Sequence, residues 1–228
     1  MAPNYIKTII CLANSRKNSG RCVAGKEING NRIGDWIRPV SARPSDELSE
    51  YERRFQDGQD PKLLDVVHIP MIEPRPSGFQ AENHLIDDRY YWVKEREATW
   101  AELEDAVDPI SPLWDNRSST YNGLHDRVDE ASANQLRSSL RLIAVKDLSV
   151  SVGVEGAAFG NAKRKVRGHF SLGGLEYRLA VTDPVVEREL FARDDGIFTV
   201  GSAILCISLG EPWDGYAYKL IAAIFVKA

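Results

Sequence analysis

The sequence predicts a mainly β protein with short helices, built from two small β-barrels in tandem that an irregular and helical segment joins. Short runs rich in β-branched and aromatic residues, bounded by Gly, Asn and Pro, predict strands. The strands fall into two groups with the same order of elements: three strands, one helix and two strands. The chain has 228 residues, of which 43% are hydrophobic, so it can bury two such cores.

Local signals place the loops and helices. The stretch from Asn14 to Gly20 is polar and ends in glycine, which predicts a loop between the first two strands. Ser45 can cap the first helix, and Asp183 followed by Pro184 predicts the start of a second one. The expected strands are 5–13, 21–28, 33–40, 63–72, 90–93, 140–152, 163–172, 175–182, 203–209 and 218–226, with helices at 46–55 and 184–192.

This order of elements is that of the OB fold, a five-stranded Greek-key barrel, here with a helix between the third and fourth strands. The alternative is an unrelated α+β domain with similar element counts. We expect one OB-like barrel over residues 1–95, an acidic helix and loop connector over 96–139, and a second barrel over 140–228. Within the connector, the spacing of Thr99 and Glu102 is that of a capping box and predicts a short helix.

Charge is distributed unevenly along the chain. Residues 1–43 hold eight basic and two acidic residues (net +6), residues 44–130 have a net charge of −12, and residues 131–228 one of +2. We expect the acidic middle to repel nucleic acid and the two ends to attract it. No apolar run reaches the ~18 residues that span a bilayer, and no signal peptide is recognisable. With an odd number of cysteines, this predicts a cytoplasmic protein without membrane contact.

Six short motifs resemble those of bacterial dual OB domain-containing proteins. They are Cys11–Lys17, Gly20–Gly25, Trp36–Ser41, Val181–Pro184, Ser208–Tyr216 and Tyr218–Ala223. The resemblance spans nearly the whole chain and is weakest over 95–139. It implies two OB-like barrels and nucleic-acid recognition, often near prokaryotic conflict and mobile-element genes. The family supplies no established catalytic residues to transfer to this chain.

The loop between the first two strands borders the usual ligand face of an OB barrel. Its amide, hydroxyl and cationic groups can contact phosphate oxygens, although a solvated hairpin tip has the same composition. The candidate nucleic-acid-binding residues here are Asn14, Ser15, Arg16, Lys17 and Arg21.

Trp36 and Arg38 fall on one face of the third predicted strand, with Arg43 shortly after it. In this interpretation Trp36 stacks on a base and the two arginines bind phosphate. The alternative places Trp36 inside the barrel and pairs Arg38 with an acid of the next helix, such as Glu47.

In the second barrel, Lys163, Lys165 and Arg167 share one face of a predicted strand with His169. Such a basic ridge suits a groove for a nucleic-acid backbone. The alternative is an exposed edge strand that charge protects against aggregation.

The loop before the last strand adds Trp213, Tyr218 and Lys219 as candidates. This loop is the second rim loop of an OB barrel, where ligands are often held. The aromatics could equally clamp the loop onto its own barrel.

No catalytic, metal or cofactor site is predicted. Cys11 and Cys22 could face each other across the first hairpin, but without a CxxC motif or a nearby Cys/His pair we expect them, with Cys206, to be core cysteines. Acid pairs such as Asp87–Asp88 lie in loop or helical segments and are typical of a solvated surface. The chain has no P-loop, Rossmann glycine pattern, nucleophile elbow or HExxH motif.

These observations favour a non-enzymatic module that binds single-stranded DNA or RNA in a prokaryotic conflict or defence system, with a protein partner at its acidic middle segment. One alternative is a sensor of a nucleotide or modified base, and another is a protein-interaction adaptor. A weaker alternative is an RNA- or DNA-processing enzyme with an unfamiliar site around Ser15, Lys17, Arg21 and Arg38.

Overall fold

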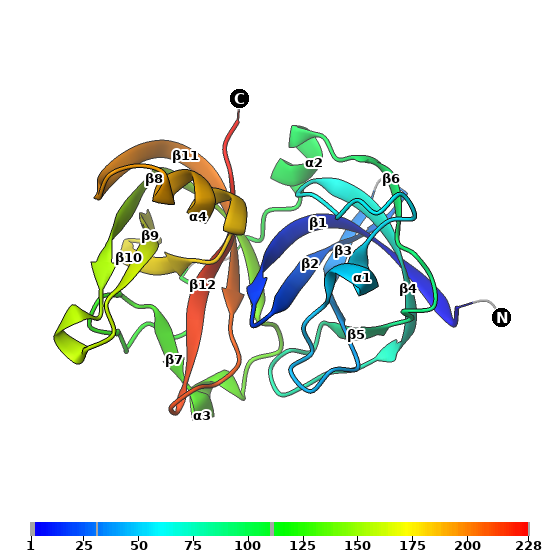
Figure 1. Ribbon diagram of the computed structural model, residues 1–228, viewed down its shortest axis with the longest axis horizontal. Helices are drawn as coiled ribbons and strands as arrows, with labels where there is room; N and C mark the ends of the chain where they lie inside the picture. Colours follow the sequence, from blue (N-terminus) through cyan, green and yellow to red (C-terminus); the bar gives the residue numbers. More distant parts are fainter. Residues whose placement is uncertain (1–2, 31, 110–111, 228) are drawn as a thin grey trace. The chain divides into compact units, whose positions relative to one another are not determined.

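The computed structural model describes residues 3–30, 32–109 and 112–227, and it is mainly β, as the sequence predicts (Figure 1). The chain forms two compact units, one of residues 1–106 with 137–139 and one of 107–136 with 140–228. The segment 96–139 is therefore not a separate connector, because both units draw on it. Among the described residues, no helix combines the length and the apolar character that a membrane span requires.

The first unit is a closed five-stranded barrel with one added strand. Its sheet order is β1-β2-β3-β5-β4-β6, and β1 also pairs with β4. β3 and β5 run parallel, and the other pairs are antiparallel. The elements are β1 (Tyr5–Lys17), β2 (Gly20–Asn29), β3 (Arg32–Val40), α1 (Glu50–Arg53), β4 (Asp65–Pro74), β5 (Asn83–Ile86), β6 (Val93–Glu97) and α2 (Trp100–Asp105).

The second unit repeats this topology. Its sheet order is β10-β9-β8-β11-β12-β7, and a parallel pairing of β10 with β12 closes the barrel. In both units the helix between the third and fourth barrel strands is present, which confirms the predicted OB order. The elements are β7 (Arg127–Asp129), α3 (Glu130–Ala133), β8 (Leu140–Glu155), η1 (Ala157–Phe159), β9 (Lys163–Leu172), β10 (Leu175–Val181), α4 (Pro184–Phe191), β11 (Gly196–Leu209) and β12 (Tyr216–Phe225).

The two cores are apolar and separate. In the first, Ile9, Val67 and Ile69 are fully or almost fully buried on paired strands β1 and β4. Gly25 lets β2 approach β1 closely, because a Cβ at this position would lie 1.9 Å from the backbone oxygen of Ile10. In the second core the rings of Phe170 and Tyr177 stack with centroids 5.3 Å apart, among aliphatic side chains of the other strands.

The two helices whose starts carry a strong capping motif begin where predicted. The helix predicted from the weaker signal at Ser45 does not. Thr99 forms its capping box with Glu102, and Asp183 accepts hydrogen bonds from two backbone N–H groups at the start of α4. The helix predicted from Asp46 is wrong in its start and length. Ser49 is the N-cap, because Asp46 has a φ of 58° and Leu48 pairs with Arg21 as extended backbone.

Strand ends in the first barrel also differ from the prediction. The expected loop from Asn14 to Gly20 is mostly strand: β1 extends to Lys17, and only Asn18 and Ser19 connect it to β2. The strand that closes the barrel is β5 rather than the predicted segment at 90–93, which partly coincides with β6.

Candidate functional site

The outer face of the second barrel carries a ridge of basic side chains on β9. Lys163 and Lys165 are exposed, Arg167 is partly exposed, and the residues that alternate with them toward Phe170 enter the core. β9 pairs with β8 from Lys163 onward but with β10 only over 167–172, so Lys163 and Lys165 lie on a stretch without a β10 partner and the alternative of a charge-protected edge strand stands there. The ridge therefore lies on the second strand of an OB barrel, which belongs to the usual ligand face.

Arg167 is the ordered member of this ridge. Its Nε and Nη2 atoms donate to the carboxylate of Glu155 at 2.6 and 2.9 Å, and its Nη1 lies 3.7 Å from Asp126. Such a bidentate pair fixes the guanidinium plane. Lys163 pairs across the strands with Glu155, while Lys165 pairs with Gly153, which carries no charge.

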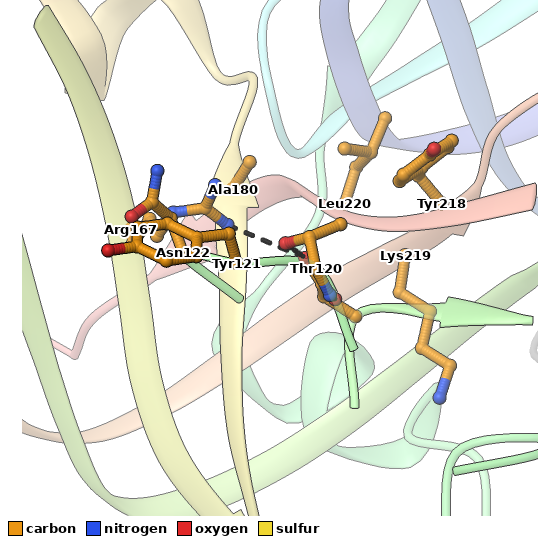
Figure 2. Close-up of a pocket in the computed structure, with 9 residues that line it drawn as sticks. Thr120, Tyr121, Asn122, Arg167, Ala180, Tyr218, Lys219 and Leu220 are labelled. Atoms are coloured by element: carbon orange, nitrogen blue, oxygen red, sulfur yellow. Dashed lines mark hydrogen bonds and ion pairs between the residues drawn. The ribbon is translucent and has the colours of Figure 1, made fainter. Parts of the chain in front are cut away.

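Beside the ridge lies a cavity of about 260 Å³ (Figure 2). Figure 2 shows Tyr121, Asn122 and Arg167 gathered at one side, with Tyr218 and Leu220 at the other. The cavity is therefore lined by the loop before β7 and by residues of β9, β10 and β12. Its lining residues are Thr120, Tyr121, Asn122, Asp126, Arg167, Ala180, Tyr218, Lys219 and Leu220.

Asp126 shapes the loop that borders this cavity. Its carboxylate accepts hydrogen bonds from the backbone N–H and the hydroxyl of Thr120 at 2.7 and 2.5 Å. Gly123 packs so close that a Cβ there would lie 1.7 Å from the carboxylate. The loop is thereby folded around one buried acid, which holds its exposed tip near the barrel surface.

Two aromatic pairs lie at the cavity, with three exposed rings and one, that of Tyr218, partly exposed. Tyr121 and Phe159 are 80% and 70% exposed, and their rings meet edge to face with centroids 5.8 Å apart. Trp213 is 71% exposed, and its ring centroid lies 6.2 Å from that of Tyr218. Phe159 lies between β8 and β9, and Trp213 between β11 and β12. These are the two loops that border the ligand face in OB folds, and exposed rings there can stack on bases.

Lys219 does not belong to this surface, which corrects its predicted role. Its side chain is 1% exposed, and its Nζ donates to the backbone oxygen of Asp115 at 2.6 Å and to Oδ1 of Asn116 at 2.7 Å. Burial lowers the pKa of Lys219 to about 7, although Asp115 and Asp126 act in the opposite direction. Lys219 is an internal tether for the 115–116 loop.

Trp36 and Arg38 are also interior, so the predicted surface pair of a stacking ring and a phosphate-binding arginine is wrong. Trp36 is 8% exposed and Arg38 is 3% exposed. Nη2 of Arg38 donates to Oγ of Ser139 at 2.8 Å and lies 3.4 Å from Oε1 of Glu82. The alternative of an internal brace describes Arg38 better, but its partner acid is Glu82 rather than Glu47.

Asn14 and Ser15 lie within β1 rather than in a loop. The side-chain amide of Asn14 donates to the backbone oxygen of Pro61 at 2.8 Å, and Ser15 is buried. Both positions therefore serve the first barrel itself, which leaves the cations near the hairpin turn as the outward-facing candidates.

Those cations remain together near the hairpin. Arg16 is exposed and pairs directly across the strands with Arg21, and Lys17 is next in the chain. These three cations form the basic group at the end of the first hairpin. Arg43 is exposed and lies 3.3 Å from a carboxylate oxygen of Glu52, so it is part of an ion pair.

Cys11 and Cys206 are buried, as expected of core cysteines, while Cys22 is only partly buried, and Cys11 and Cys22 do not face each other across the hairpin. Cys11 pairs with Gly25 and Cys22 with Ser15, and no disulfide forms. Across the described ranges, His, Cys, Asp and Glu side chains do not gather in groups of three or more that could hold a metal ion.

Sequence reasoning missed Tyr121 and Phe159, although aromatic residues within polar and Gly-rich loops are a recognisable signal. It also missed Arg178, which lies on the same outer face as Arg167. Its alternation with Tyr177 and Leu179, both buried, could have placed it there.

The comparisons with known proteins agree with this architecture. A family model described as the dual OB-containing domain matches residues 7–224, which is nearly the whole chain. Searches of curated proteins and of solved structures returned no significant match. Two barrels of OB topology and a match of this length together show that the chain belongs to the dual OB-containing domain family.

Proposed function

We propose that this protein binds single-stranded DNA or RNA on the outer face of its second barrel and that it does so without catalysis. The observation that carries the proposal is the basic ridge of β9 beside two aromatic pairs, each with one exposed ring in a rim loop, Phe159 in one and Trp213 in the other. Cations can follow the phosphate backbone while rings stack on bases, which is how single strands are bound without strong sequence preference.

The first barrel contributes less to this proposal than its sequence suggests. Trp36 and Arg38 are interior, which leaves the hairpin cations Arg16, Lys17 and Arg21 as a secondary phosphate-contacting surface. A role in a conflict or defence system, a protein partner and a cytoplasmic location stay predictions.

The test is fluorescence anisotropy with labelled single-stranded DNA, single-stranded RNA and duplex DNA across a salt series. The variant Lys163→Ala/Lys165→Ala removes two exposed cations of the ridge. We expect weaker binding and a salt dependence whose slope falls by about 0.7 for each phosphate that the variant no longer neutralises. Tyr121→Ala/Phe159→Ala should weaken binding by about 1–3 kcal/mol per stacked base, with little change in the salt slope.

The matched control is Lys146→Ala/Arg188→Ala. It removes the same charge from the same unit, but Lys146 lies outside the part of β8 that pairs with β9, and Arg188 is exposed on α4. Binding of no single strand at low salt would refute the proposal. Equal losses in the control and the ridge variant would show non-specific attraction instead. Stabilisation by mononucleotides without polymer binding would favour the nucleotide sensor.

A further inference from the structure

The strand register brings a second set of basic groups together on the outer face, next to Arg167. His169 on β9 lies opposite Arg178 on β10 and Ser149 on β8. In the adjacent row, Arg167 lies opposite Ser151, whose hydroxyl is 2.8 Å from Nε2 of His169. Two arginines, an imidazole and a hydroxyl are therefore neighbours on three paired strands.

The carboxylates near this cluster are already engaged. Glu155 accepts both hydrogen bonds from Arg167. At the other end of the rows, Oγ of Ser171 lies 2.6 Å from Oδ2 of Asp147 and 2.5 Å from Oε1 of Glu176, and its one proton can go to only one of these carboxylates. Asp126, the other acid near Arg167, accepts hydrogen bonds from Thr120. Among the described residues, none of these carboxylates forms an ion pair with Arg178.

Arg178 is the group that this surface leaves unsatisfied. Its Nε atom is buried and has no hydrogen-bond acceptor among the residues that the structure describes. A buried donor without an acceptor costs free energy, and a site that binds a ligand is one place where such a cost is accepted. An anion that bound at the Nη groups of Arg178 would offset this cost by adding charge-assisted hydrogen bonds to the same guanidinium.

His169 reports the electrostatic character of the cluster. Its pKa is lowered by partial burial, and further by the positive charges of Arg178 and Arg167. The groups that face it are these two arginines, Ser149 and Ser151 of β8, and Ser171 further along its own strand.

We propose that Arg178, His169 and Ser151 form a phosphate-binding subsite on the outer face of β8, β9 and β10. The proposal rests on the proposed function, because it names the place where that face would hold one phosphate group of a nucleic acid. The guanidinium of Arg178 donates to phosphate from its two Nη groups, whose bidentate geometry suits an anion. The hydroxyl of Ser151 donates as well, and the imidazole takes up a proton once the anion is present.

Proton uptake makes the subsite testable through His169 itself. The chain has four histidines, whose ring C–H signals can be followed by NMR, and His169→Gln assigns the signal. The pH titration is run on the protein alone, with inorganic phosphate and with a single-stranded oligonucleotide. We expect the oligonucleotide to raise the titration midpoint of His169 by about one pH unit, and binding to tighten by roughly tenfold below that midpoint.

Variants separate a binding role from a structural one. Arg178→Ala should abolish the ligand-induced shift of His169, and Arg178→Lys should restore part of it, because it keeps the charge and loses the fork. Arg188→Ala, off this face, should leave the shift intact. If Arg178→Ala fails to fold, the ligand-induced shift of His169 is measured in Arg178→Lys and Ser151→Ala instead.

The outcomes distinguish this proposal from the one on which it rests. Oligonucleotide binding with an unchanged His169 titration, and undiminished binding by Arg178→Lys, overturns the subsite and leaves the proposed function standing. A shift of His169 with inorganic phosphate, in a protein that binds no oligonucleotide, supports the subsite for a free phosphate or nucleotide and overturns single-strand binding.

Discussion

Lys219 offers a quantitative test of the interior of the second barrel. The lysine is buried against Tyr177, with its Nζ 5.6 Å from the ring centroid, and its two acceptors lie on the 115–116 loop. A neutral amine still carries the two N–H groups that these acceptors require. Deprotonation therefore removes the cost of a buried charge without breaking either hydrogen bond.

The sign and size of the effect follow from the shift in pKa. The pKa of Lys219 is about 7 in the folded protein against an ordinary 10.5. Between these values the unfolded chain holds a proton that the folded chain lacks, so the free energy of unfolding rises with pH. The slope is about 1.4 kcal/mol per pH unit, which gives up to ~3 kcal/mol between pH 7 and pH 9. Below pH 7 the penalty is fully present and this contribution is flat.

The assay is urea unfolding of the wild type and of Lys219→Met at half-unit steps from pH 6 to pH 9. Methionine keeps a long side chain and removes the titrating group. We expect the difference between the two unfolding free energies to be constant below pH 7 and to grow in favour of the wild type above it. Parallel curves over the whole range would refute the reasoning, because they would mean that Lys219 keeps its proton in the folded state.

The remaining predictions concern the first barrel. Arg38→Ala should lower the free energy of unfolding by about 3–5 kcal/mol, because it leaves the buried carboxylate of Glu82 without its cation. In urea unfolding, Arg38→Ala/Glu82→Gln should recover part of this loss. Equal losses in the two variants would contradict a charge origin. In thiol labelling followed by mass spectrometry, Cys22 should react first, because Cys11 is fully buried and burial raises its pKa to about 12; simultaneous labelling in the folded protein would contradict the described packing.

The sequence predicts this fold well where the signal is local. The caps at Thr99 and Asp183 lie next to the groups they bind, and strand periodicity depends only on residues close in the chain. The ridge around Lys165 was predictable for the same reason, because alternation along one strand decides which side chains leave the core.

The candidate site was harder to predict because burial is a tertiary property. Trp36 and Arg38 have the same strand pattern whether or not other segments cover them, and Glu82 lies too far along the chain to be paired by spacing. Lys219 is a similar case, since a lysine between Tyr218 and Leu220 is expected at the surface until its acceptors are known. Arg178 became a candidate only through the register of β9 and β10.

The division of the chain limits how these barrels can be inherited or engineered. Residues 107–136 complete the second unit, yet the chain then returns to the first unit for residues 137–139 before β8 begins. Ser139 in that return segment is fully buried and receives a hydrogen bond from Arg38. Any single cut between 106 and 140 therefore deprives one unit of residues it needs. An excised or transplanted second barrel must therefore carry residues 107–136 with it, and the first barrel then loses residues 137–139.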